Sequence, residues 1–459
     1  MIVLDDVGVD KIESFDFLSA PPYPRTPTID GLAATGIRFR NFYTNPICGP
    51  TRALLMTGRY GFRTGMGTNG EVYRLPDSEL FLPELLRQGF APGGGYRCGA
   101  FGKWHLDQDG THPVTNGFHR FQGHMKNTSD HFVWPKLEQD EGGPLVGPFT
   151  VARWSPSEVR EDAVDWITAQ SEPFFAYVAF NPPHRDWQVP PLATLSPATQ
   201  AELAGYAEGQ RALNADERRL FYRAMLESVD TEIQNLLTGI GPARLANTMV
   251  FVVCDNGTER MAIQPPHVLA HGKPSGYELA IRVPLIVSGP LVPQPVPPGG
   301  HWVDALVEAV DLWPTIAELT GADVALAFQN GGYATPYPVI DGQSVLPLLL
   351  DPSAPGPNEF AYSELFSPGG VYKSTQCLSV HLRAITDGEF KYMRWVDKTG
   401  TPPCRLAQYT HELYHLPSDP NETLNLLTGP LTPDQFAAFD HLRQTMDHLS
   451  SAPGKLLPR

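Results

Sequence analysis

The chain has 459 residues, 42% of them hydrophobic, and its acidic residues outnumber the basic ones to give a formal net charge of -16. This length suffices to bury a large core and predicts one large domain with a smaller one beside it. The negative charge argues against nucleic acid or an anionic membrane surface as a partner. An anionic substrate would need a local positive pocket, for which Arg52, Lys103 and Lys273 are candidates.

Short apolar runs alternate with helical patterns through the first three quarters of the chain. Buried strands are predicted at residues 2–4, 174–180, 249–253 and 285–287. This alternation is typical of an α/β fold, in which helices cover a parallel or mixed sheet.

The C-terminal quarter has a different pattern. Residues 382–392 predict a β-hairpin with an Asp-Gly turn. A helix is predicted from Thr432, with one apolar face made of Phe436, Phe439, Leu442 and Met446.

A proline-rich segment at residues 351–358 predicts the boundary between two units. We expect residues 1–350 to form an α/β catalytic domain with a mixed, mostly parallel central sheet sandwiched by helices. Residues 351–459 are expected to form a smaller α+β subdomain with an antiparallel sheet and a terminal helix.

Polar side chains follow three of the predicted strands where each strand ends. Asp5 and Asp6 follow the first strand, and His184 comes shortly after the second. Asp255 and Asn256 follow the third. Because ligands bind beyond the carboxyl ends of strands in open α/β sheets, we expect these side chains on one rim. Apart from His184 they offer oxygen ligands, which suit a hard cation such as Ca²⁺ or Mg²⁺ better than Zn²⁺.

A cysteine precedes one of the helical patterns. Cys48 lies two residues before Pro50, which opens an apolar run, and Arg52 lies four residues after the cysteine. A helix N-terminus offers free backbone N–H groups and partial positive charge, so a reactive group there faces an anion-binding site. A buried cysteine before an ordinary amphipathic helix is the simpler interpretation for an isolated cysteine. The five cysteines are scattered without a Cys-x-x-Cys pair, so no disulfide framework is expected.

Residues 411–415 spell HExxH, the helical zinc motif of metalloproteases. Pro417 and Pro420 follow at once, which argues against a helix through this segment. His441 is the only histidine soon afterwards that could complete a zinc site.

A series of separated blocks resembles the type I sulfatases, members of the alkaline phosphatase superfamily, in the order in which that family has them. The resemblance extends over most of the chain and predicts a strand, not a zinc-binding helix, at residues 411–415. The blocks are Asp5-Asp6, Thr26-Pro27-Thr28-Ile29-Asp30-Gly31-Leu32-Ala33, Cys48-Gly49-Pro50-Thr51-Arg52, Gly102-Lys103-Trp104-His105-Leu106, Phe180-Asn181-Pro182-Pro183-His184, Cys254-Asp255-Asn256-Gly257, Lys273 with Glu278, and Glu412-Leu413-Tyr414.

This resemblance implies that a formylglycine-generating enzyme oxidises Cys48 to formylglycine. The hydrated aldehyde would attack the sulfur of a sulfate monoester and release the alcohol. Its second hydroxyl would then allow sulfate to leave as the aldehyde re-forms, a route closed to serine or a thiol. The family's metal is usually Ca²⁺, with Mg²⁺ possible, and the ligands implied here are Asp5, Asp6, Cys48, Asp255 and Asn256.

The same resemblance assigns roles to five basic residues. Arg52 would hold the hydrate and the metal-site carboxylates, and Lys103 and Lys273 would clamp sulfate oxygens, where fixed cations lower the barrier. His184 would protonate the leaving alcohol, and His105 would assist proton removal from the hydrate. Lys103 and His105 are two residues apart, which places them on one side of an extended segment.

The sequence departs from the family pattern at several positions, among them Glu278-Leu279-Ala280, which lacks the usual glycines after the glutamate. Thr51 stands where serine is common, and Asp107 stands where glycine commonly follows the Lys-Trp-His-Leu block, adding a negative charge near an anion site. The expected function is hydrolysis of a small-molecule or carbohydrate sulfate ester. The alternatives are a phosphonate or phosphate ester hydrolase of the same superfamily and a catalytically silent binding homologue.

No run approaches the roughly 18 apolar residues that a membrane helix needs, and no basic and apolar leader opens the chain. The sequence therefore predicts a cytoplasmic protein without a membrane partner. Only four residues precede Asp5, fewer than is usual in the family, so a periplasmic or secreted location is expected if a signal peptide precedes Met1.

Overall fold

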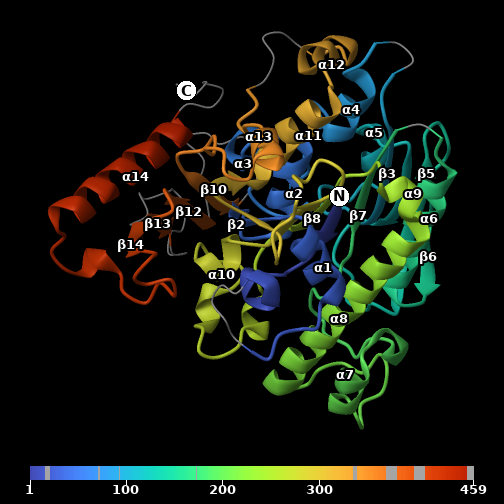
Figure 1. Cartoon of the computed structure of the whole chain (residues 1–459), viewed down its shortest axis with the longest axis horizontal. Coiled ribbons are helices and arrows are strands. Elements are labelled where there is room, and N and C mark those ends of the chain that lie inside the picture. Colours follow the sequence, from blue (N-terminus) through green and yellow to red (C-terminus); the bar gives the residue numbers. More distant parts are fainter. Residues whose placement is uncertain are drawn as a thin grey trace, which may run out of the picture.

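A computed structural model of the chain describes residues 1–15, 21–70, 73–91, 94–171, 173–333, 339–367, 380–396 and 409–451. A ten-stranded sheet lies between helices, and a four-stranded sheet with one long helix stands at its side (Figure 1). The expected α/β fold with a smaller C-terminal α+β part is therefore confirmed.

The strands of the large sheet follow the order β10-β2-β9-β8-β1-β7-β3-β4-β5-β6. Their bounds are β1 (Ile2–Leu4), β2 (Ile37–Tyr43), β3 (Arg97–Lys103), β4 (Arg120–His124), β5 (Val133–Asp140), β6 (Val146–Ala152), β7 (Phe174–Ala179), β8 (Val250–Cys254), β9 (Leu285–Ser288) and β10 (His301–Glu308). The block β8-β1-β7-β3-β4 is parallel throughout, as is the pair β2-β10. β9, β5 and β6 run antiparallel to their neighbours.

The four predicted strands are observed as β1, β7, β8 and β9. In β1 every side chain is apolar and buried, because parallel neighbours flank it and helices cover both faces of the sheet. Ile2 lies opposite Val178 on one side and Val252 on the other, so the carboxyl ends of β1, β7 and β8 lie next to one another.

Two helical layers cover the sheet (Figure 1). One contains α1 (Pro27–Thr35), α6 (Ser155–Ala169) and α8 (Ala215–Ile240), and the other contains α2 (Cys48–Thr57), α4 (Leu82–Gln88) and α11 (Leu312–Thr320). The shorter helices are α3 (Gly61–Thr64), α5 (His112–Thr115), α7 (Pro197–Glu202), α9 (Pro242–Leu245), α10 (Glu278–Ile281), α12 (Val324–Asn330) and α13 (Leu346–Leu350).

Helix α2 is buried over its whole length and begins at Cys48, close to the start expected from Pro50. It ends at Gly58, whose φ of 64° is the left-handed conformation that stops many helices. Burial of all its residues places the N-terminus of α2, and with it Cys48, inside the molecule.

The small sheet is antiparallel and consists of β11 (Ala361–Ser367), β12 (Val380–Thr386), β13 (Phe390–Val396) and β14 (Tyr409–His415). β12 and β13 form the predicted hairpin, with Gly388 at a φ of 91° in its turn. β14 contains the HExxH residues, so the strand reading is confirmed and the helical zinc motif is excluded. The position of the domain boundary near residue 350 stays a prediction.

Helix α14 (Pro433–Ser451) packs on β12 and β13. Leu442 and Met446 are fully buried, as predicted. The prediction was wrong for Phe436, whose side chain is 59% exposed. The contact with the sheet comes from later turns, where Phe439 packs edge-on against Tyr392.

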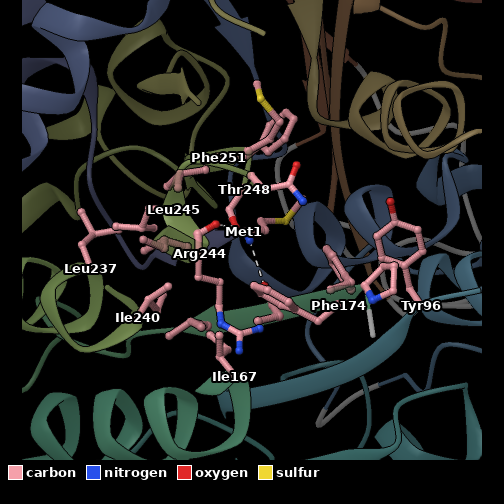
Figure 2. Close-up of a pocket in the computed structure, with 18 of the residues that line it drawn as sticks. Met1, Tyr96, Ile167, Phe174, Leu237, Ile240, Arg244, Leu245, Thr248 and Phe251 are labelled. Carbon is pink, nitrogen blue, oxygen red and sulfur yellow. Dashed lines mark hydrogen bonds between the residues drawn. The ribbon is translucent and has the colours of Figure 1, made fainter. Parts of the chain in front are cut away.

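A cavity of about 1090 Å³ lies at the amino end of the central strands (Figure 2). Phe174 and Phe251, from the starts of β7 and β8, line it together with Leu237, Ile240 and Arg244. It therefore lies at the opposite end of the sheet from the polar residues that follow β1, β7 and β8.

No helix within the described ranges combines the length and apolar character required to cross a membrane. Cys48, Cys98 and Cys254 are free thiols, and Cys377 and Cys404 lie outside the described residues.

Candidate active site

The predicted rim of polar residues is present at the carboxyl ends of the central strands. Asp5 and Asp6 directly follow β1, and Asp255 with Asn256 directly follows β8. These residues and His184 are all buried. One donor atom from each of four residues lies within 4.8 Å of the others, namely Asp5, Asp6, Cys48 and His184.

The Cys48 thiol stands at the centre of this group. Its Sγ donates to Asp5 Oδ1 at 3.3 Å, and the ammonium groups of Lys103 and Lys273 lie 3.3 Å and 3.0 Å from it. Lys103 is the last residue of β3, whereas Lys273 comes from the loop between β8 and β9. Two cations from distant parts of the chain thus converge on the first residue of α2.

The packing around the turn before α2 accounts for the residue types at positions 49 and 51. Thr51 Oγ1 accepts from the Asn45 N–H at 3.0 Å and donates to the Asn45 carbonyl at 3.1 Å. A serine offers the same hydroxyl, so the departure at Thr51 leaves this turn intact. A Cβ on Gly49 would lie 2.9 Å from Asn69 Cα, so the close approach requires glycine.

Each site cation has one close carboxylate partner, and Arg52 also lies 3.8 Å from Asp5 Oδ2. Arg52 binds Asp255 through Nε and a terminal nitrogen at 2.9 Å and 2.8 Å. Lys103 forms an ion pair with Asp5, and Lys273 forms one with Asp6. The side chains of the site therefore carry no surplus positive charge, because three cations face three carboxylates.

Arg52 also connects the elements that build the site. Its remaining terminal nitrogen donates to the Lys103 carbonyl at 2.7 Å and lies 3.2 Å from the Tyr177 hydroxyl of β7. One buried guanidinium thereby joins α2 to the ends of β3 and β8, which suits the planar, multi-donor geometry of arginine.

Asp6 adopts a backbone conformation that is uncommon outside glycine, with a φ of 64°. The Tyr222 hydroxyl donates to its carbonyl at 2.7 Å, and Asn256 Nδ2 donates to its Oδ1 at 2.8 Å. Strained backbone held by its surroundings is frequent at functional sites.

Burial and neighbouring charges shift the pKa values of several site residues. Burial alone would raise the pKa of Asp5, but the permanent charges of Lys103, Arg52 and Lys273 hold that pKa well below its usual range. Burial and the Asp5 charge raise the pKa of Asp255 to about 6 and that of the Cys48 thiol to about 12. Burial lowers the pKa of His184 well below its usual value, so its imidazole is neutral.

Two buried oxygen atoms of the site have no hydrogen-bond partner among the described residues, Asp6 Oδ2 and Asn256 Oδ1. Buried polar atoms without partners are rare, because each one costs free energy. Both atoms are oxygens next to the Asp5 and Asp255 carboxylates, a donor set that fits a hard divalent cation. The residues present are therefore suited to hold Ca²⁺ or Mg²⁺.

His184 and His105, the two histidines predicted for the site, have different surroundings. His184 Nδ1 lies 2.6 Å from the Arg185 carbonyl, which leaves Nε2 3.9 Å from Asp6 Oδ2. His105 is buried with a φ of 66°, two residues beyond the end of β3. The argument that an extended segment would align His105 with Lys103 was wrong, because the chain leaves the extended conformation there. The His105 backbone carbonyl instead lies against Gly49 at the start of α2.

Some contacts were not assigned from the sequence. Asn181 Nδ2 donates to Asp5 Oδ2 at 3.3 Å and was only part of a quoted block. Tyr177 gave no signal, since a tyrosine within an apolar strand looks like core. The Asp107 charge, expected to disturb an anion site, is paired with Arg74 at 3.0 Å.

Lysines and a helix N-terminus around Cys48, beside buried oxygens suited to a metal, are the arrangement expected of a hydrolase for esters of tetrahedral oxyanions. The profile of the sulfatase family matches residues 1–322. The chain therefore belongs to the sulfatase family, within the alkaline phosphatase superfamily, and is a sulfuric ester hydrolase.

Individual relatives are similar along almost the whole chain. Human (Homo sapiens) arylsulfatase A is 29% identical, over 98% of this chain and 88% of that protein. The crystal structure of Ps i-CgsB has a TM-score of 0.72 at 23% identity, over 99% of this chain and 93% of its own. The structure of BT4656 in complex with its substrate D-glucosamine-2-N,6-O-disulfate has a TM-score of 0.70 at 18% identity, over 99% and 98%. These structures share the fold described above.

Proposed function

We propose that this protein hydrolyses sulfate monoesters to an alcohol and inorganic sulfate, with formylglycine made from Cys48 and a divalent cation held by Asp5, Asp6, Asp255 and Asn256. The observation that carries this proposal is the convergence of Lys103 and Lys273 on Cys48 Sγ, at 3.3 Å and 3.0 Å, at the buried N-terminus of α2. A formylglycine-generating enzyme is the implied maturation partner.

A divalent cation and formylglycine account for features that the encoded side chains alone leave open. A divalent cation supplies Lewis-acid stabilisation of charge on sulfate oxygens, and the unpartnered Asp6 Oδ2 and Asn256 Oδ1 are oxygens suited to hold it. Formylglycine supplies an electrophilic carbonyl, and hence a nucleophilic oxygen, that a thiol lacks. Ca²⁺ is proposed ahead of Mg²⁺ because it accepts more oxygen ligands in a flexible arrangement.

The chain's own residues bind the sulfate group and orient the site. The ammonium groups of Lys103 and Lys273 flank position 48, where they would bind sulfate oxygens and stabilise the charge that develops on them during transfer. Arg52 holds Asp255 and the Lys103 carbonyl, so it keeps the end of β3 in place. Each of these groups is preorganised by ion pairs and burial.

The neutral His184 is proposed to act in proton transfer to the leaving alcohol. Its Nδ1 faces the Arg185 carbonyl, which favours the tautomer with the hydrogen on Nδ1. Nε2 then faces the site without a hydrogen, so His184 would first take up a proton there from solvent and then pass it to the leaving oxygen. For His105 the proposed role in proton removal rests on the family resemblance, and its buried backbone beside Gly49 is compatible with it.

The test couples maturation to turnover. The protein is produced with and without a formylglycine-generating enzyme, and the mass of the Cys48 peptide is determined for both. Both samples are then assayed with Ca²⁺ for sulfate released from sulfated sugars, aryl sulfates and alkyl sulfates. We expect sulfate release only from the converted sample, and Cys48→Ala should abolish it.

Cys98→Ala is the matched control, because Cys98 is also a buried free thiol but lies at the start of β3, away from the site. It should retain turnover. Faster hydrolysis of aryl phosphates or phosphonates than of every sulfate ester would favour the alternative hydrolase. A converted, metal-loaded protein that releases neither product would favour the silent binding homologue.

A further inference from the structure

Lys273 is carried by a loop, unlike Lys103 at the end of β3 and Arg52 in α2. Its backbone N–H donates to the Thr258 carbonyl at 2.9 Å, which fixes the segment on the side that precedes it. A lysine side chain is long and flexible, so the position of its backbone decides whether the ammonium reaches both Asp6 and Cys48. The contacts that hold the segment after Lys273 therefore influence where its ammonium group lies in the site.

The segment after Lys273 lies directly on the small C-terminal sheet. Gly276 is buried there, and a Cβ at this position would stand 2.7 Å from Met393 Sδ and 3.2 Å from Leu382 Cδ1. The next residue, Tyr277, donates its hydroxyl hydrogen to Glu412 Oε2 of β14 at 2.8 Å. The loop thus contacts β12, β13 and β14 within two residues.

A buried charge network fixes the end of the same segment. Lys391 of β13 donates to Glu278 Oε1 at 3.0 Å and forms an ion pair with Glu422. Glu422 Oε2 in turn accepts the backbone N–H of Glu278 at 2.6 Å. Exposure is 0% for Lys391, 1% for Glu278 and 3% for Glu422, so these charges depend on one another for compensation.

The main domain contributes the remaining partners of Glu278. The Tyr43 hydroxyl and an Arg282 nitrogen lie 3.2 Å and 3.3 Å from Glu278 Oε2. Glu278 is thereby bonded to the main domain through one carboxylate oxygen and to the small sheet through the other. It joins the two units five residues after Lys273.

We propose that Lys391 and Glu422 are positioning residues for Lys273. They hold Glu278 and the preceding loop against the small sheet, and so keep the Lys273 ammonium between Asp6 and Cys48. This inference rests on the proposed function, in which Lys273 binds the sulfate group. It gives the small C-terminal sheet a part in the reaction although it contributes no residue that contacts Cys48 among those described.

A pair of equivalent substitutions tests the proposal. Glu422→Gln keeps the shape and an acceptor oxygen but removes the charge that pairs with Lys391. Glu364→Gln is the matched control, since Glu364 of β11 is buried like Glu422 and likewise accepts a main-domain backbone N–H, that of Phe62, at 2.7 Å. Only Glu422 is connected to the Lys273 loop.

Both variants are prepared with formylglycine verified by mass and assayed with the best sulfate ester. We expect Glu422→Gln to lower kcat/KM by about tenfold to a hundredfold, the size of loss that misplacement of a binding group produces. Glu364→Gln should change it by less than about twofold. Equal losses in the two variants would show a general effect of the interface and overturn the proposal.

A double-mutant cycle separates positioning from stability. If Glu422 acts through Lys273, adding Glu422→Gln to Lys273→Met causes no further loss of kcat/KM. A loss as large as in the wild-type background contradicts the inference. Should Glu422→Gln alone fail to fold, the variant Lys391→Met with Glu422→Gln removes one charge of each sign and serves in both experiments.

Hydrogen–deuterium exchange gives a readout that needs no turnover. In Glu422→Gln the peptide spanning Lys273 to Arg282 should exchange faster, and in Glu364→Gln it should exchange as in the wild type. Unchanged exchange in Glu422→Gln overturns the inference even if the enzyme is active. A converted wild type that releases no sulfate refutes the proposed function instead, so the two failures are distinguishable.

Discussion

Removal of divalent cations is expected to destabilise the folded protein as well as to stop turnover. The perturbation is exhaustive dialysis against a chelator, followed by titration with Ca²⁺ or Mg²⁺. The reason is structural, because Asp6 Oδ2 and Asn256 Oδ1 are buried without partners within the described part of the chain. A cation that both oxygens contact binds the folded chain and has no equivalent site in the unfolded one.

The size of the effect follows from the site. Two unsatisfied buried atoms cost about 1–3 kcal/mol each, so their satisfaction is a sufficient source for binding. At a free concentration of about one hundred times Kd, a ligand stabilises the folded state by about 2.7 kcal/mol. For a chain of 459 residues, whose unfolding entropy is about 1 kcal/mol/K, that corresponds to a rise in Tm of about 3 °C.

Differential scanning fluorimetry over a range of Ca²⁺ and Mg²⁺ concentrations measures this shift. Asn256→Ala should lose most of it, because the substitution removes one of the two oxygens. Asn358→Ala is the control, since Asn358 is a partly buried amide that bonds Asp311 away from the site. A Tm that does not change with cation concentration, or an equal shift in Tm for Asn256→Ala and the wild type, would refute the reasoning.

Three further changes have defined outcomes. Lys103→Met removes a fully buried cation beside Cys48 and should lower kcat by about 10²–10³-fold in the converted enzyme, measured by steady-state kinetics. Burial raises the pKa of Glu364 to about 7, so the folded state holds a proton that the unfolded state has lost, and stability falls as pH rises from about 4.5 to 7. Glu364→Gln should remove up to about 3 kcal/mol of that fall, as measured by urea unfolding at pH 5 and pH 8. Leu442→Ala should cost about 2–5 kcal/mol by the same assay, whereas Phe436→Ser should be nearly neutral because Phe436 is 59% exposed.

The rim of the site was predictable because its geometry follows from parallel strands. Apolar runs at β1, β7 and β8 identify three strands, and the polar residues after each run must then lie at one end of the sheet. Asp5, Asp6 and Asp255 needed no contact information beyond this rule. Cys48 needed the additional rule that proline is favoured in the first turn of a helix.

The rest of the site depends on long-range packing. Lys273 reaches Cys48 from a loop, and the residues that fix this loop, Lys391 and Glu422, lie more than a hundred positions later in the chain. No local pattern marks a lysine in an antiparallel hairpin as part of an internal ion network. The predicted alignment of His105 with Lys103 was wrong for a different reason, since a positive φ cannot be inferred from the spacing of two residues along the chain.

The charge of the site also differs from the expectation drawn from composition. An acidic protein was expected to need Arg52, Lys103 and Lys273 as a positive pocket, and all three do lie beside Cys48 or its ligands. Each is neutralised by its own carboxylate, so side chains alone give a polar but balanced site. A surplus of positive charge for a sulfate monoester arises only when a divalent cation joins the proposed ligands. The ion pairs therefore serve to place the cations, and the attraction for the substrate would depend on the proposed metal, which would connect the unpartnered oxygens of Asp6 and Asn256 to substrate binding.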